Sequence, residues 1–159
     1  MIIPDALART KSGQVFAYQY DESMLLMSAE QCRLMRQART LFLDGTFKVC
    51  PRLWAQLYLI RGELPSGHNV LLCAALLLNK QPATYAALFE KIGELCGRFE
   101  PATIISDFEE GLVTVVHEKF PQANHTGCHF HYCQAVVRWI RTHCYQRYFI
   151  SSKSPQLEN

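Results

Sequence analysis

The sequence has no long apolar run and no N-terminal targeting pattern. The apolar run "VLLCAALLL", residues 70–78, has nine residues, whereas a helix that spans a bilayer needs about twenty. The N-terminal stretch "MIIPDALARTKSG" lacks the basic region and the long apolar segment of a secretory signal peptide. We therefore expect an intracellular protein with no membrane-spanning helix.

The number of cysteines is odd, so they cannot all pair within the chain. The seven cysteines are scattered through apolar segments, which favours reduced, buried thiols over the disulfide framework of a secreted protein. With 159 residues, of which 49% are apolar, the chain is long enough for one domain with a real core.

Charge is scarce, at 19% of residues and a net +2, which does not by itself indicate a nucleic-acid partner. Residues 128–153 nevertheless contain no acidic residue, and their basic residues are Arg138, Arg141, Arg147 and Lys153. The segment either contacts phosphate groups or forms a solvated helix face. The sequence leaves both interpretations open.

The apolar pattern predicts three successive strands, over residues 41–49, 54–62 and 69–78. Pro65 and Gly67 indicate a hairpin between the second and the third, and the third run is apolar enough for a central strand buried on both faces. Helices and strands then alternate: helices from Pro82 to residue 99, over 108–119 and over 130–148, with strands at 101–107 and 124–130 between them. Before this core, residues 15–20 predict a short strand, and Ser28 with Gln31 predicts a capping box at a helix start.

The resulting order, β-β-β-α-β-α-β-α, predicts an α/β fold with a mixed sheet and helices packed on its faces. Asp44 and Asp107 fall on the first and fourth strands of this order. If these strands are neighbours, two carboxylates face each other across one strand spacing of about 4.8 Å. Because such a pair repels, a hard divalent cation such as Mg²⁺ or Mn²⁺ would stabilise it. Each acid also has a structural interpretation, since Asp44 precedes Gly45 as in a turn and Asp107 can cap the next helix.

Three blocks carry a resemblance to a known family: "LDGTFKVCPRLWAQLYLIRG", "LLLNKQPATYAALFEKI" and "ISDFEEGLVTVVHEKFPQANHTGCHFHYCQAVVRWI". In this order they resemble the transposase domain of Mutator-like elements, the MULE group, over roughly residues 40 to 141. The resemblance implies an RNase H-like core with a DDE site that cuts and joins DNA by phosphoryl transfer with two divalent metal ions. Asp44 would be the first catalytic acid and Asp107 the second. The predicted boundaries are a flanking segment 1–39, a partial transposase core 40–150 and a polar tail 151–159.

The chain departs from the family pattern in its acidic residues. The third acid of the family is a glutamate well downstream, after a helical insertion, but the only acid after Glu118 is Glu158, in the polar tail. The resemblance therefore implies a transposase fragment, or a gene derived from one, with little strand transfer of its own. Two aspartates retain at most one weakly bound Mg²⁺. The family's N-terminal DNA-binding zinc finger is also missing, since the first forty residues hold one cysteine, Cys32.

The resemblance also implies a C-x2-H element, which Cys128 and His131 match within the cluster "HTGCHFHYC". Zinc is the natural ion for thiolate and imidazole ligands, but a structural zinc site needs four of them. We favour the alternative, in which Cys128 is a small buried residue and His131 orients the first turn of the last helix.

Two functions remain open at this point, together with a third, an unrelated nuclease that uses a carboxylate pair. The first is a DDE-type catalytic fragment that acts on transposon ends or target DNA. The second is a non-catalytic DNA- or protein-binding module on the same fold, with the basic last helix as its contact surface. Nuclear location follows from the resemblance alone, and a homo-oligomer is a further candidate partner. A core without its late helix is expected to leave a sheet edge or face uncovered.

Overall fold

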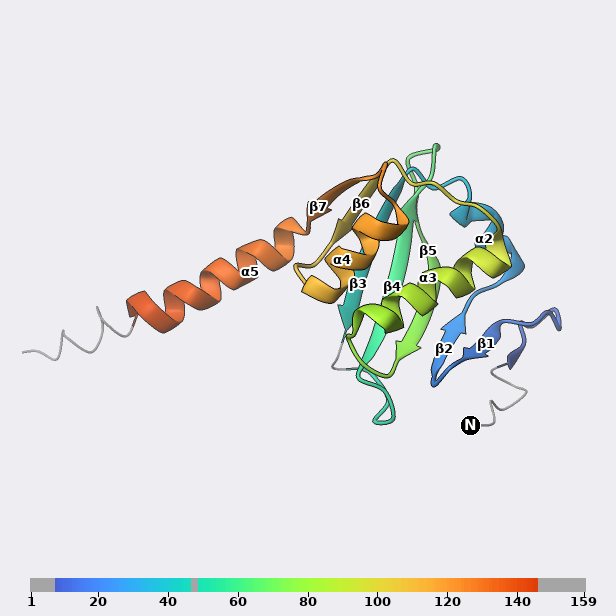
Figure 1. Cartoon of the computed structure of the whole chain (residues 1–159), viewed down its shortest axis with the longest axis horizontal. Helices are drawn as coiled ribbons and strands as arrows, with labels where there is room; N and C mark the ends of the chain where they lie inside the picture. The colour runs from blue at the N-terminus through green and yellow to red at the C-terminus, as the bar shows by residue number, and fades with distance from the viewer. Residues whose placement is uncertain (1–7, 47–48, 146–159) are drawn as a thin grey trace, which may run out of the picture.

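The computed structural model describes residues 8–46 and 49–145 and contains a seven-stranded sheet, in the order β1-β2-β5-β4-β3-β6-β7 (Figure 1). The strands are β1 Ala17–Tyr20, β2 Ser23–Leu26, β3 Thr40–Thr46, β4 Gln56–Glu63, β5 Asn69–Leu77, β6 Thr103–Ser106 and β7 Asn124–Gly127. β3, β4 and β5 pair antiparallel, whereas β6 runs parallel to β3 and β7 runs parallel to β6.

This arrangement confirms the predicted fold class at the level of an α/β fold with a mixed sheet. The predicted order β-β-β-α-β-α-β-α corresponds to β3-β4-β5-α3-β6-α4-β7-α5. Parallel neighbours require crossover connections, and α3, Pro82–Cys96, and α4, Glu110–Lys119, supply them. The β4–β5 hairpin turns where predicted, with Gly67 at a φ of 81° that only glycine adopts readily.

The N-terminal residues join the same sheet. β1 and β2 form a hairpin, and β2 pairs antiparallel with β5. The predicted capping box is confirmed: the Ser28 side chain accepts from the Gln31 backbone, and the Gln31 side chain accepts from the Ser28 backbone, at the start of α2, Ala29–Met35. The boundary proposed at residue 39 remains a prediction, and the tail 151–159 lies outside the described residues.

Helix α4 begins later than predicted. Glu109 has an extended backbone and occupies the N-cap, so the helix starts at Glu110. Phe108 therefore lies before the helix and is 62% exposed, not part of the buried stripe that we expected. Its ring lies over Gly127, where a Cβ would clash with the ring carbons.

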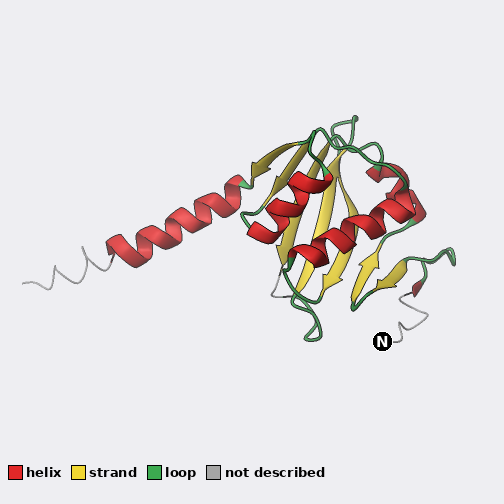
Figure 2. Cartoon of the chain, viewed as in Figure 1, coloured by secondary structure: helices red, strands yellow, loops and turns green. Residues whose placement is uncertain are grey.

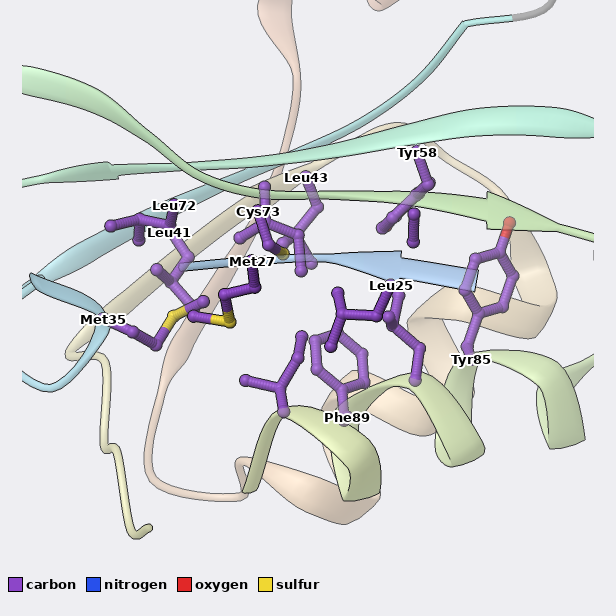
Figure 3. Close-up of a cluster of buried hydrophobic side chains, with 14 of the residues drawn as sticks. Leu25, Met27, Met35, Leu41, Leu43, Tyr58, Leu72, Cys73, Tyr85 and Phe89 are labelled. Carbon is purple, nitrogen blue, oxygen red and sulfur yellow. The ribbon is translucent and has the colours of Figure 1, made fainter. Parts of the chain in front are cut away.

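The core lies between the sheet and the helices. α3 and α4 cover one face of the sheet (Figure 1), and α2 contacts both β5 and α3. Figure 3 shows the apolar side chains of this layer packed between the strands and α3. Its largest fully buried members are Leu25, Met27, Met35, Leu41, Leu43, Tyr58, Ile60, Leu72, Leu77, Tyr85, Leu88 and Ile92.

The opposite face of the sheet is less covered, which corrects the prediction for β5. Leu72, Cys73, Ala75 and Leu77 are buried, but Leu71 is 46% exposed. β5 is thus a central strand buried mainly on one face, the face that α3 covers (Figure 1). On its open side the sheet carries half-buried Phe42, Leu57, Leu59, Leu76 and Ile105.

The last helix leaves the body of the molecule. α5, His129–Ile140, extends away from the sheet (Figure 2) and contains no buried residue. It ends earlier than the predicted 130–148, in a π-helical turn, Arg141–Tyr145. Its large exposed apolar side chains are Phe130, Tyr132, Val136, Val137, Trp139 and Ile140.

The state of the cysteines and the length of the helices can be compared with the expectations from composition. Cys32, Cys73 and Cys96 are buried thiols, and none of the six cysteines whose side chains the structure describes forms a disulfide. In the same part of the chain, every helix is too short or too polar to cross a bilayer.

Candidate active site

The register of the parallel strands brings the two predicted acids together. Leu43 of β3 pairs with Ser106 of β6, and the next residues along the two strands are Asp44 and Asp107. Leu43 and Ser106 are both buried on the helix side of the sheet, so the alternation of strand side chains directs Asp44 to the open face. Asp44 thus lies in β3 and Asp107 directly after the end of β6, the strand that pairs with β3. A common site for the two acids remains a prediction.

The surroundings of Asp107 penalise its negative charge. Burial is the main cause that raises the pKa of this carboxyl above its ordinary value, and the neighbouring carboxylates of Glu109 and Asp44 raise it further. Lys80 acts in the opposite direction, and so does His131 when its ring is protonated. Carboxylates crowded in this way are the environment that a divalent cation stabilises.

His131 reaches the acid pair from the first turn of α5. Its Nε2 lies 3.8 Å from Oδ1 of Asp44, and the Asp44 side chain is 41% exposed. The Nδ1 of His131 is buried without a hydrogen-bond partner. The C-x2-H element therefore contributes its histidine to the surroundings of Asp44.

The cysteine of that element has a different position. Cys128 is the N-cap residue of α5, and its backbone N–H donates to the Ser106 carbonyl at 2.6 Å. In the part of the chain that the structure describes, no group of three or more His, Cys, Asp or Glu side chains is arranged to hold a metal ion. Zinc binding by Cys128 and His131, the interpretation that we did not favour, stays untested. Cys128 is half-buried, not fully buried as the favoured alternative expected.

A polar network that the sequence analysis did not identify lies next to Asp107, buried at Gln56 and Tyr85 and exposed at Lys80. Lys80 Nζ donates to Glu109 Oε2 at 2.6 Å, and the Tyr85 hydroxyl donates to Glu109 Oε1. Gln56 Nε2 in turn donates to the Tyr85 hydroxyl at 2.7 Å. Glu109 lies within the "SDFE" block and Lys80 within the "LLLNKQP" block, which was the available signal; nothing in the sequence linked Gln56 or Tyr85 to them.

The network approaches β3 closely at Gly45. A Cβ on Gly45 would lie 2.5 Å from Oε1 of Gln56, and Gln56 is 1% exposed. The Asp-Gly pair is therefore part of a strand, not the turn that was one interpretation of the sequence. Glycine at this position lets β3 lie against Gln56 next to the acid.

The basic residues proposed for nucleic-acid contact lie farther along α5. Arg138 belongs to the helix and Arg141 follows it, and both are exposed. Together with Phe130 and Val137 they line a shallow hollow on the helix surface. Arg147 lies outside the described residues.

Comparison with known proteins agrees with the resemblance noted in the sequence. Among curated proteins, no significant match was found. Among solved structures, the chain is similar to the HTLV-2 integrase catalytic core domain in complex with magnesium (trimeric form), with 14% identity, a TM-score of 0.34, and coverage of 74% of this chain and 76% of that one. Residues 40–135, more than half of the chain, match the MULE transposase domain. The chain therefore belongs to the MULE transposase domain family.

Proposed function

We propose that this chain carries a DDE-type catalytic core in which Asp44 and Asp107 hold Mg²⁺ or Mn²⁺ at a DNA backbone. The observation that supports this most strongly is the Leu43–Ser106 pairing, since it places an acid next in line on each of two adjacent parallel strands. The donor set fits such an ion, because hard cations take carboxylate oxygens.

The residues of the chain prepare the site in three ways. Asp44 and Asp107 supply oxygen ligands, and the burial of Asp107 makes its unscreened charge costly. Lys80 offsets part of that charge, and His131 does so when protonated. Tyr85 and Lys80 hold Glu109 in place next to Asp107. When bound, the divalent ion would activate a nucleophile and stabilise the phosphoryl transition state.

Catalysis by this chain alone is expected to be weak. Two metal ions about 3.5–4 Å apart require several fixed oxygen ligands. We propose that Asp44 and Asp107 by themselves hold one weakly bound ion and support little strand transfer.

The DNA partner is proposed to lie along α5 as well as at the acids. Arg138 and Arg141 are exposed at the far end of the helix, where they would neutralise phosphate groups outside the site. Nuclear location and self-association belong to the same proposal.

A non-catalytic binding module is the second candidate, because α5 buries none of its own residues. Its aromatic and apolar side chains, with Arg138 and Arg141, form a surface that would suit a macromolecular partner. On this alternative, DNA or protein binding would survive the loss of the acids.

Incubation of the chain with duplex DNA ends and Mn²⁺ separates the candidates. The catalytic proposal predicts slow nicking that Asp44→Ala abolishes, with DNA binding retained. DNA binding without any nicking, unchanged in Asp44→Ala, would favour the binding module. Nicking that is unaffected by Asp44→Ala would contradict the assignment of the acids.

A further inference from the structure

A histidine pair lies on the far side of β6 from the acid site. His117, in the last turn of α4, places its Nε2 3.3 Å from Nδ1 of His125 in β7. The two rings are nearly perpendicular, with an interplanar angle of 85°. His117 is exposed and His125 is half-buried, so the space beside the facing nitrogens is open to solvent from the α4 side.

The contacts of Ser106 favour one tautomer of His125. The Ser106 hydroxyl lies 2.8 Å from the Asp107 carbonyl, which can only accept. When the single hydroxyl proton is used there, the 2.8 Å contact between Ser106 Oγ and His125 Nε2 is donated by the Nε2–H of the imidazole. In that tautomer the ring has its lone pair on Nδ1, the nitrogen that lies 3.3 Å from His117 Nε2.

The separation of the facing nitrogens suits two ligands on one ion. Zinc–nitrogen bonds of 2.0–2.1 Å at a tetrahedral angle put two ligand nitrogens roughly 3.3–3.4 Å apart, and the observed separation is 3.3 Å. Histidine ligands commonly donate their other ring N–H to a protein group, which sets their orientation. The fully buried Ser106 provides that acceptor for His125.

We propose that His117 Nε2 and His125 Nδ1 chelate a borderline divalent transition-metal ion of the zinc class. Water would complete the coordination shell, since no third His, Cys, Asp or Glu of the described residues is arranged to join the pair. The proposed site differs from the carboxylate pair in the metal that it would select. Imidazole ligands favour zinc, copper or nickel, whereas carboxylates favour magnesium or manganese. The proposed site is also separate from the Cys128–His131 element.

The ion would couple two elements next to the catalytic strand. It would join the C-terminal turn of α4 to the edge strand β7. Through His125 and Ser106, it would also restrict the backbone carbonyl of Asp107. The inference does not depend on the proposed catalytic function, because none of its ligands is an acid of the candidate active site.

Titration calorimetry with Zn²⁺ on the metal-free chain, in millimolar Mg²⁺, tests the inference. We expect one Zn²⁺ per chain, with binding weakened about tenfold or more in both His117→Gln and His125→Gln. Cu²⁺ bound to the wild type should show the electron paramagnetic resonance pattern of two imidazole nitrogens. Two variants serve as matched controls: His68→Gln, an exposed histidine in the β4–β5 turn, and Cys128→Ser. Both are expected to bind Zn²⁺ as the wild type does.

Three results would overturn the inference. These are Zn²⁺ affinity unchanged in His117→Gln, Zn²⁺ affinity lost in Cys128→Ser but kept in His117→Gln, or no binding by the wild type at all. The last result would mean that the pair forms a direct N–H···N hydrogen bond only. His117 is exposed, so its variant tests the idea even if His125→Gln does not fold. Asp44→Asn should leave Zn²⁺ binding unchanged, so this inference and the proposed function can fail independently.

Discussion

Leu43 and Ser106 form the last pair of the parallel β3–β6 ladder, and in both strands the next residue is an aspartate. Both residues of the pair are buried against the helix layer. Packing of the core therefore fixes the register, because a slip by one residue would turn every side chain of β3 to the opposite face. The position of the acid pair is thus a consequence of how the apolar residues pack.

Gly45→Ala should disturb the site through its neighbour. The new Cβ would meet Gln56 Oε1 at 2.5 Å, and Gln56 is buried and bonded to Tyr85. We expect a loss of about 1–3 kcal/mol in the free energy of unfolding, measured by urea denaturation, together with weaker Mn²⁺ binding.

Gly93→Ala is the matched control for that change. Gly93 lies inside α3, and a Cβ there would have no neighbour within 4 Å. It should stabilise the protein by about 0.5–1 kcal/mol, since alanine loses less entropy than glycine in a helix. A Gly45→Ala variant as stable as Gly93→Ala would show that Gln56 moves aside without cost.

Tyr85→Phe should cost about 1–3 kcal/mol of stability, because the amide of the buried Gln56 would lose its acceptor. Glu109 would lose one of its two donors, and Lys80 alone would hold it. Thermal unfolding and Mn²⁺ titration measure the two effects. Tyr132→Phe, at a side chain on α5 that is 56% exposed, should change stability by less than about 0.5 kcal/mol. Equal stability of the two variants would mean that the network contributes little.

The metal-free chain should gain stability at neutral pH when Asp107 is replaced by Asn. Burial raises the pKa of Asp107 above its ordinary value of 3.8, so the folded state binds the proton more tightly than the unfolded state. Its free energy of unfolding therefore falls as the pH rises from about 3.8 through the folded-state pKa. Asp107→Asn removes this pH-dependent loss of stability. The difference in free energy of unfolding between the variant and the wild type should therefore disappear below the ordinary pKa of aspartate.

Denaturation in EDTA at several pH values measures this difference. Glu118→Gln, at an exposed residue of α4, is the control and should change the stability at neutral pH by less than about 0.5 kcal/mol. A stabilisation by Asp107→Asn that is the same at acidic and neutral pH would show that the effect is not electrostatic.

Arg138→Ala and Arg141→Ala should each weaken DNA binding to a similar extent for different DNA sequences. If each arginine contacts one phosphate, the slope of log affinity against log salt should decrease in magnitude by about one for each residue removed. Arg98→Ala, at a residue paired with Glu100, is the control. Unchanged slopes in the two α5 variants would support the other interpretation of the sequence, a solvated helix face.

The sequence predicted the local elements well because their signals are local. Pro82 at the first turn of α3, the Ser28 capping box and the Gly67 turn each depend on a few neighbouring residues. The sequence left the pairing of the first and fourth strands of the core as a condition, and the parallel β3–β6 ladder meets that condition. Burial on the two faces of β5 was not, because its apolar composition suits either one covered face or two.

The hydrogen-bond network next to the site could not be predicted from the sequence. Gln56, Tyr85 and Glu109 come from β4, α3 and the α4 N-cap, and their bonds span at least 24 positions. The approach of His117 to His125 depends likewise on how α4 packs beside β7. An apolar stripe on a helix shows that the helix can pack against a partner, but it does not show that a partner is present. The apolar side chains of α5 follow helical spacing, yet none is buried in the described chain.

Direct measurement of Mn²⁺ binding tests the central claim that Asp44 and Asp107 form one cation site. Electron paramagnetic resonance titration of the wild type, Asp44→Asn and Asp107→Asn should show one weakly bound Mn²⁺ in the wild type and an affinity lower by about tenfold or more in each variant. Glu30→Gln, at an exposed residue of α2 paired with Arg33, should bind as the wild type does. If both aspartate variants retain wild-type affinity, or if only one loses it, the two carboxylates do not share a cation.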